Sequence, residues 1–135
     1  MFKCKHFGIK ELVSKKVFSD RGNKAWALLD DRALRTLDAL RERFGSITVN
    51  DWQWGGTNQY RGLREPDCQI GAAYSQHRFG RAFDCVFRDT TAQAVREFIL
   101  DNPGEFPYLS AIEMGTSWLH FDVRNPDGTI QTFNP

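Results

Sequence analysis

The sequence predicts an α+β fold, with a small antiparallel sheet and flanking helices on one side of it. Two segments, residues 30–44 and 90–102, have the apolar spacing of a helix face. Two others, residues 82–87 and 118–123, alternate as strands do. A chain of 135 residues with 41% hydrophobic content is enough for one core but not for two. We therefore expect a single domain that spans residues 1–135.

The segment from Asp30 to Phe44 is the clearest helix. An aspartate pair stands at its amino end, and Gly45 follows its last turn, as helix boundaries prefer. Its apolar face consists of Leu34, Leu37, Leu40 and Phe44. The chain before it is less regular: residues 9–13 indicate a short helix and residues 19–23 a polar loop.

A strand and a loop are expected after this helix. Residues 47–52 have the composition of a strand, and residues 55–58 form a loop that is rich in glycine and asparagine. Trp52, Trp54 and Tyr60 flank this loop. They could stack on a sugar or peptide ligand, but aromatic residues beside a glycine loop more often close off a core.

The stretch 82–87 predicts a strand that is apolar on both faces except at Asp84. Its faces are Phe83, Cys85 and Phe87 on one side and Ala82, Asp84 and Val86 on the other. An isolated ionised carboxylate in an apolar setting costs several kcal/mol or must take up a proton. A metal ion is therefore the most economical partner for Asp84.

The carboxyl-terminal third predicts one helix and one strand. Thr90 and Gln93 have the spacing of a capping box at a helix start, and Pro103 prevents the helix from continuing. Residues 125–128 predict a hairpin turn, and residues 129–133 predict a last short strand.

Charge and hydropathy argue against two classes of partner, nucleic acids and membranes. The 18 lysine and arginine residues are balanced by 17 acidic residues, so the basic stripe of a nucleic-acid-binding protein is missing. The chain has no apolar run long enough to span a membrane and no signal peptide. We expect no nucleic-acid partner, no membrane insertion, and synthesis in the cytoplasm.

The cysteines do not predict a disulfide framework. Cys4, Cys68 and Cys85 are odd in number and irregular in spacing, which favours a reducing compartment. A second metal cluster of Cys4, His6 and Cys68 is disfavoured, because its spacing matches no standard site. Cys85 alternates away from Asp84 and is expected to be packed rather than reactive.

A histidine and an aspartate seven residues apart, His77 and Asp84, indicate half of a metal site. His120 lies in the second alternating stretch and could bring its imidazole beside Asp84. Zinc accepts imidazole and carboxylate ligands together in tetrahedral geometry. Three protein ligands leave one position open, which points to hydrolysis with one zinc ion rather than to a closed structural site.

These motifs resemble those of the zinc peptidases of the D-alanyl-D-alanine carboxypeptidase family, which share a fold with lysostaphin-type peptidases and the hedgehog signalling domain. The pattern Ser-x-His-x-x-Gly-x-Ala-x-Asp is followed by a strand with Trp-x-His-x-Asp. Every fixed position of the first pattern is filled, by Ser75, His77, Gly80, Ala82 and Asp84. Upstream, residues 62–64 resemble the family's Ser-Gly-aromatic-Arg element.

The general base departs from the family's commonest pattern. Carboxypeptidases of this family often place an acid three positions before the last histidine, where this chain has Ser117. The hedgehog branch places the acid further upstream, and Glu113 lies seven residues before His120. A two-residue turn at residues 115–116 would pair Glu113 with Trp118, on the face of His120 and within reach of a water on the metal. We therefore expect Glu113 to be the base.

Further residues are expected around the metal and the substrate. The resemblance implies that Arg64 helps to bind substrate and to polarise the scissile carbonyl, and its fork also suits a carboxylate. Arg61 could serve instead, because the loop length allows either register. Asp122 is expected to hold His120 or an arginine in place. Ser75 and Trp118 complete this set.

The resemblance implies that the substrate is the stem peptide of bacterial peptidoglycan. Endopeptidase cleavage, for example between L-alanine and D-glutamate, ranks first, and D-Ala-D-Ala carboxypeptidase activity is the alternative. The compact chain resembles the phage or prophage members of the family, which act on the cell wall as endolysins after release or as virion-associated wall-degrading enzymes. We expect a monomer. The alternative of another class is a non-catalytic zinc-stabilised domain, such as a phage structural or peptide-binding protein. Ser117, which stands where carboxypeptidases of the family often have an acid, supports this alternative.

Overall fold

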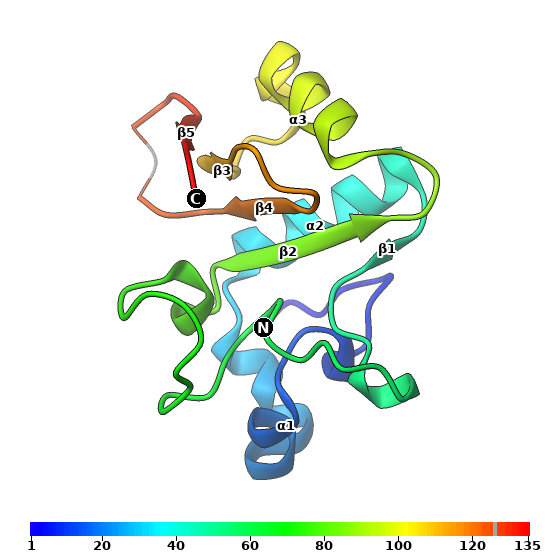
Figure 1. Cartoon of the computed structure of the whole chain (residues 1–135), viewed down its shortest axis with the longest axis vertical. Coiled ribbons are helices and arrows are strands. Elements are labelled where there is room, and N and C mark those ends of the chain that lie inside the picture. The colour runs from blue at the N-terminus through cyan, green and yellow to red at the C-terminus, as the bar shows by residue number, and fades with distance from the viewer. Residues whose placement is uncertain (126) are drawn as a thin grey trace.

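The computed structural model describes residues 1–125 and 127–135, and its α+β architecture confirms the predicted fold class (Figure 1). The described residues form three α-helices and a five-stranded sheet in the order β1-β2-β4-β3-β5. The strands are β1 (Ile47–Thr48), β2 (Ala82–Phe87), β3 (Ala111–Glu113), β4 (Leu119–Asp122) and β5 (Gln131–Phe133). The helices are α1 (Lys15–Arg21), α2 (Asp31–Phe44) and α3 (Ala92–Asp101).

The central pair of strands is β2 and β4, which run antiparallel. Asp84 and His120 are partners in this register, so two of the predicted metal ligands stand side by side on adjacent strands. On its other edge β2 pairs with the short β1 at Val86 and Phe87. Closer to the start of β2, the backbone N–H of Asp84 donates to the Arg61 carbonyl at 2.8 Å. The fold thus brings His120 and the Arg61 carbonyl, from two separate parts of the sequence, next to Asp84.

The last strand takes a different place from the expected one. The predicted hairpin turn at residues 125–128 includes residue 126, which lies outside the described residues. The strand expected over residues 129–133 is present over Gln131–Phe133, but it pairs in parallel with β3 rather than with β4. The edge of β4 is already occupied by β3, so the chain continues past both strands to reach a free edge.

Helix α2 confirms the clearest prediction. The Asp30 carboxylate accepts a hydrogen bond from the Arg32 backbone N–H at 2.9 Å and caps the amino end, and Gly45 ends the helix with a φ of 86°. Leu34, Leu37 and Leu40 are fully buried. Helices α2 and α3 pack on one face of the β2–β4 pair, whereas α1 lies at the end of the molecule away from the sheet (Figure 1).

Three local predictions are wrong. The capping residue of α3 is Thr91, whose hydroxyl accepts from the Ala94 N–H at 3.1 Å, and not Thr90. The polar loop expected at residues 19–23 is instead the end of α1 and the start of a 3-10 helix. Helix α1 forms here because Ser14 caps its amino end and because Val17, in its first turn, is buried. The strand expected over residues 47–52 ends at Thr48.

The three aromatic residues beside the glycine loop have three different environments. The indole N–H of Trp52 donates to the Val13 carbonyl at 2.9 Å, and its ring packs against Phe18. These contacts favour a role for Trp52 in closing off the core. Trp54 is 65% exposed, whereas Tyr60 lines a cleft described below.

Among the described residues, no helix has the length and apolar character needed to cross a membrane.

Candidate metal centre

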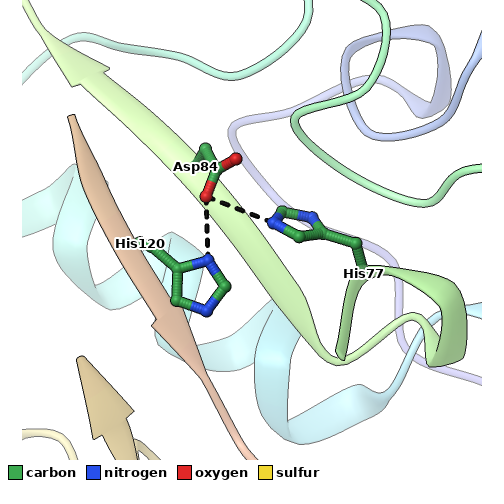
Figure 2. Close-up of side chains that lie close together, drawn as sticks. All are labelled: His77, Asp84 and His120. Carbon is green, nitrogen blue, oxygen red and sulfur yellow. Dashed lines mark hydrogen bonds and ion pairs between the residues drawn. The ribbon is translucent and has the colours of Figure 1, made fainter. Parts of the chain in front are cut away.

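The three predicted ligands converge on one point (Figure 2). Nε2 of His77 lies 3.2 Å from Oδ1 of Asp84, and Nδ1 of His120 lies 2.9 Å from the same oxygen. One ligand atom from each residue lies within 4.8 Å of the other two. It is the one group of this kind in the described part of the chain, and its residues could hold a metal ion.

The local sequence around His77 explains its position. His77 lies in a 3-10 turn, Gln76–Phe79, whose amino end is capped by the Ser75 hydroxyl, which accepts from the His77 N–H at 3.3 Å. Gly80 ends the turn with a φ of 68°, and a Cβ there would stand 2.2 Å from the Leu28 carbonyl oxygen. Only glycine fits this position. The serine and the glycine of the motif therefore hold the histidine, and Ser75 also lines the cleft.

The second nitrogen of each imidazole has an oxygen partner. Nδ1 of His77 donates to the Gly62 carbonyl at 3.0 Å, and Nε2 of His120 donates to Oδ2 of Asp122 at 2.9 Å. In the neutral rings, the nitrogens that face Asp84 then carry lone pairs. Two imidazole lone pairs and a carboxylate oxygen therefore point at one small space, which only protons or a cation can fill favourably. This donor set fits a metal ion.

Asp122 contacts both a histidine and an arginine, where the sequence predicts one or the other. It is fully buried, and the Arg124 guanidinium donates to both of its oxygens at 2.7 Å in a fork geometry. Arg124 was not among the predicted residues. The period of two along β4 and its extension, which places His120, Asp122 and Arg124 on one face, is the signal that identifies it.

The electrostatic environment couples the three ligands. Burial acts to raise the pKa of Asp84, but its close contacts with His120 and His77 hold this pKa well below its usual range. Burial lowers the pKa of His77. Burial would also lower the pKa of His120, but its hydrogen bonds to Asp122 and Asp84 raise this pKa to about 9. Metal binding requires the neutral imidazole, so a bound metal would take the place of a proton on His120.

The centre lies in the wall of an open cleft of about 660 Å³. Glu113 and Trp118 line this cleft together with all three candidate ligands. Trp118 is 38% exposed and lies at the rim. The cleft also contains residues that the sequence motifs do not identify, Tyr74 and Phe133, and the Phe133 ring packs edge-on against His120.

Glu113 lies on the predicted face of the sheet, the face of His120, but its pairing partner on β4 differs from the predicted one. The two-residue turn would pair Glu113 with Trp118, but Ile112 pairs with Phe121, so Glu113 stands next in line opposite His120. The reason is a longer connection between β3 and β4, which α3 holds. The buried Arg96 donates to the carbonyls of Thr116 at 2.9 Å and Trp118 at 3.1 Å. A shift of two residues preserves the face of a strand.

Both predicted arginines lie beside Asp84. The Arg64 guanidinium donates to the carbonyls of Tyr60 at 2.8 Å and Ile70 at 3.2 Å, and it lines the cleft. Burial lowers the pKa of Arg64. The Arg61 carbonyl accepts from Asp84, and its side chain lines a neighbouring cavity that also includes Arg64.

The three cysteines are free, and the disfavoured cluster does not form among the described residues. The Cys4 thiol donates to the Leu34 carbonyl, and His6 lies 3.2 Å from Glu42. Cys85 is buried in the core, and burial raises its pKa well above the usual value, as expected of a packed thiol.

Comparisons with family models, with curated proteins and with solved structures found no match to this chain.

Proposed function

We propose that this chain is a zinc-dependent peptidase that cleaves bonds within the stem peptides of bacterial peptidoglycan. The observation that carries the proposal is the convergence of His77, Asp84 and His120 on one point in the wall of an open cleft. Two imidazoles and one carboxylate suit zinc, and three protein ligands leave room for a water or a substrate oxygen. Bound zinc supplies a water of lowered pKa and polarises the scissile carbonyl.

Glu113 is the proposed general base. It lines the same cleft, half-buried, on the strand next to His120. Its side chain makes no hydrogen bond or ion pair within the described residues, so the carboxylate is available to the reaction. It takes the proton of the attacking water and returns it to the leaving amine.

Arg64 is the proposed electrophilic partner. Its guanidinium is held by two backbone carbonyls and remains at the cleft wall near Asp84. A fixed cation is suited to stabilise the negative charge that develops on the scissile carbonyl oxygen. Asp122 and Arg124 keep the His120 ring in the tautomer that a ligand needs.

The choice of peptidoglycan stem peptides rests on the motif resemblance, and the choice of an endopeptidase rests also on the shape of the cleft. A second cavity of about 260 Å³ adjoins the first at Asp84, because the two share Arg64, Asp84 and Trp118, and together they extend the cleft. A chain that passes through such a cleft can be cut at an internal bond. A D-Ala-D-Ala carboxypeptidase would need only one side.

The test is digestion of purified peptidoglycan, followed by mass spectrometry of the soluble fragments. We expect the zinc-loaded protein to release fragments whose new termini identify the bond, and a zinc chelator to abolish their release. Glu113→Gln should abolish release while zinc stays bound, and the exposed Glu105→Gln should behave as the unchanged protein does.

A zinc-loaded protein that releases no fragments from several wall chemistries would contradict the proposal. It would favour a zinc-stabilised binding domain, for which Ser117, in place of an acid, is the supporting feature. Fragments that lack only a terminal D-alanine would favour the carboxypeptidase.

A further inference from the structure

The cleft has two arms that meet at Asp84. Arg64, Asp84 and Trp118 belong to both. The larger arm continues toward Glu113, Arg124 and the carboxyl-terminal strand. The smaller arm, which we name the arginine arm, is lined by residues 57–61 and Ile70 in addition to the shared residues.

The two arms differ in their free positive charge. In the larger arm the Arg124 cation is neutralised by the Asp122 carboxylate, which it binds through two nitrogens. In the arginine arm Arg61 forms no ion pair with any described acidic residue, and neither does Arg64, which lines both arms. The only side-chain hydrogen bond of Arg61 among the described residues is a long one, 3.4 Å to the Val49 carbonyl.

Hydrogen bonds hold the backbone of the arginine arm in place at Arg61. The backbone N–H of Arg61 donates to the Asn50 side chain at 3.0 Å, which anchors it from the opposite side to its bond with Asp84. Asp51 lies close enough to Arg61 for the arginine to help lower its pKa, after the larger effect of Asn58, but both of its oxygens accept from Asn58 at 2.9 Å. An arginine on a fixed backbone without a partner is prepared to bind an anion.

We infer that the arginine arm is a subsite for a carboxylate carried by the peptide residue next to the scissile bond, with Arg61 as its principal recognition group. This inference rests on the proposed function, because the two arms meet at Asp84, one of the three candidate metal ligands. It explains why two unpaired guanidinium groups stand beside the same aspartate. In this arrangement Arg61 determines substrate specificity by binding the carboxylate, whereas Arg64 stabilises the charge on the scissile carbonyl oxygen.

Equilibrium binding tests the subsite separately from catalysis. The probes are two fluorescein-labelled stem peptides that contain L-alanyl-D-glutamate, one with a free glutamate α-carboxylate and one with a carboxamide there. Fluorescence anisotropy with zinc-loaded Glu113→Gln protein should show tighter binding of the carboxylate peptide, by about tenfold or more. Arg61→Gln should abolish this preference, and Arg61→Lys should retain part of it.

The matched control is Arg88→Gln, which removes one positive charge at an exposed site outside the cleft and should keep the full preference. Equal binding of both peptides, or an equal weakening of both by Arg61→Gln, would overturn the subsite. Cleavage by the unsubstituted protein gives a separate result. Cleavage of both peptides without a preference leaves the peptidase and removes the subsite, whereas a preference without cleavage leaves the subsite and removes the peptidase.

Discussion

The two faces of the β2–β4 pair are formed by the same strands but are stabilised by different interactions. On the helix side, Phe83, Cys85, Leu119 and Phe121 are fully buried apolar residues that α2 and α3 cover. On the cleft side, alternate positions of the same strands carry Asp84, His120 and Asp122. The first face is stable by burial alone. The second concentrates hydrogen-bond acceptors and needs protons or a cation, so it is built for binding at some cost to stability.

The largest expected effect is on the helix side. Phe121→Ala removes a fully buried ring that packs against Phe83, with ring centroids 6.0 Å apart. Deleting a buried aromatic side chain typically costs about 3–5 kcal/mol, so the free energy of unfolding should fall by that amount. Denaturant unfolding of the metal-free protein measures it. A loss below about 1 kcal/mol would show that this face is not a tightly packed core.

The next effect is on the cleft side and depends on the metal. Zinc at one hundred times its dissociation constant should raise the free energy of unfolding by about 2.7 kcal/mol, and a chelator should remove this gain. Asp84→Asn should abolish the response to zinc, because it removes the charged ligand that both histidines face. The exposed Asp89→Asn, on the loop after β2, should respond fully. A full response from Asp84→Asn would exclude the proposed ligand set.

A smaller effect is expected one layer behind the ligands. Asp122→Asn keeps the shape of the side chain but removes the charge that holds His120 and Arg124. Loss of such a partner typically lowers metal affinity by about 10- to 100-fold. Competition with a chromophoric chelator measures this affinity, and the exposed Asp101→Asn is the control. Unchanged affinity would mean that Asp122 serves only Arg124.

The smallest effect tests where the cleft side ends. Val86 alternates with Asp84 on β2 but is 39% exposed and lines neither arm of the cleft. Val86→Thr keeps a β-branched side chain in a strand, so stability should change by less than about 0.5 kcal/mol, with zinc affinity unchanged. Thermal unfolding with and without zinc measures both. A change in zinc affinity would extend the functional face beyond the three ligands.

The sequence alone determined the features that depend on local periodicity. The spacing of leucines predicts α2, because a helix face repeats within one segment. Alternation predicts that Asp84 leaves the core on β2 and that His120 and Asp122 share a face on β4. The three candidate ligands followed from these faces and from the motif spacing, and the structure brings them together.

Tertiary contacts decided the features that join distant segments. The register between β3 and β4 depends on Arg96, a residue of α3 that holds the connecting loop, and no local pattern encodes that contact. The parallel pairing of β5 depends on which sheet edge is free once β3 has paired with β4. The Gly62 carbonyl behind His77 likewise comes from a loop outside the motif. Spacing along the chain sets the face on which a side chain stands, whereas packing between elements sets its partners.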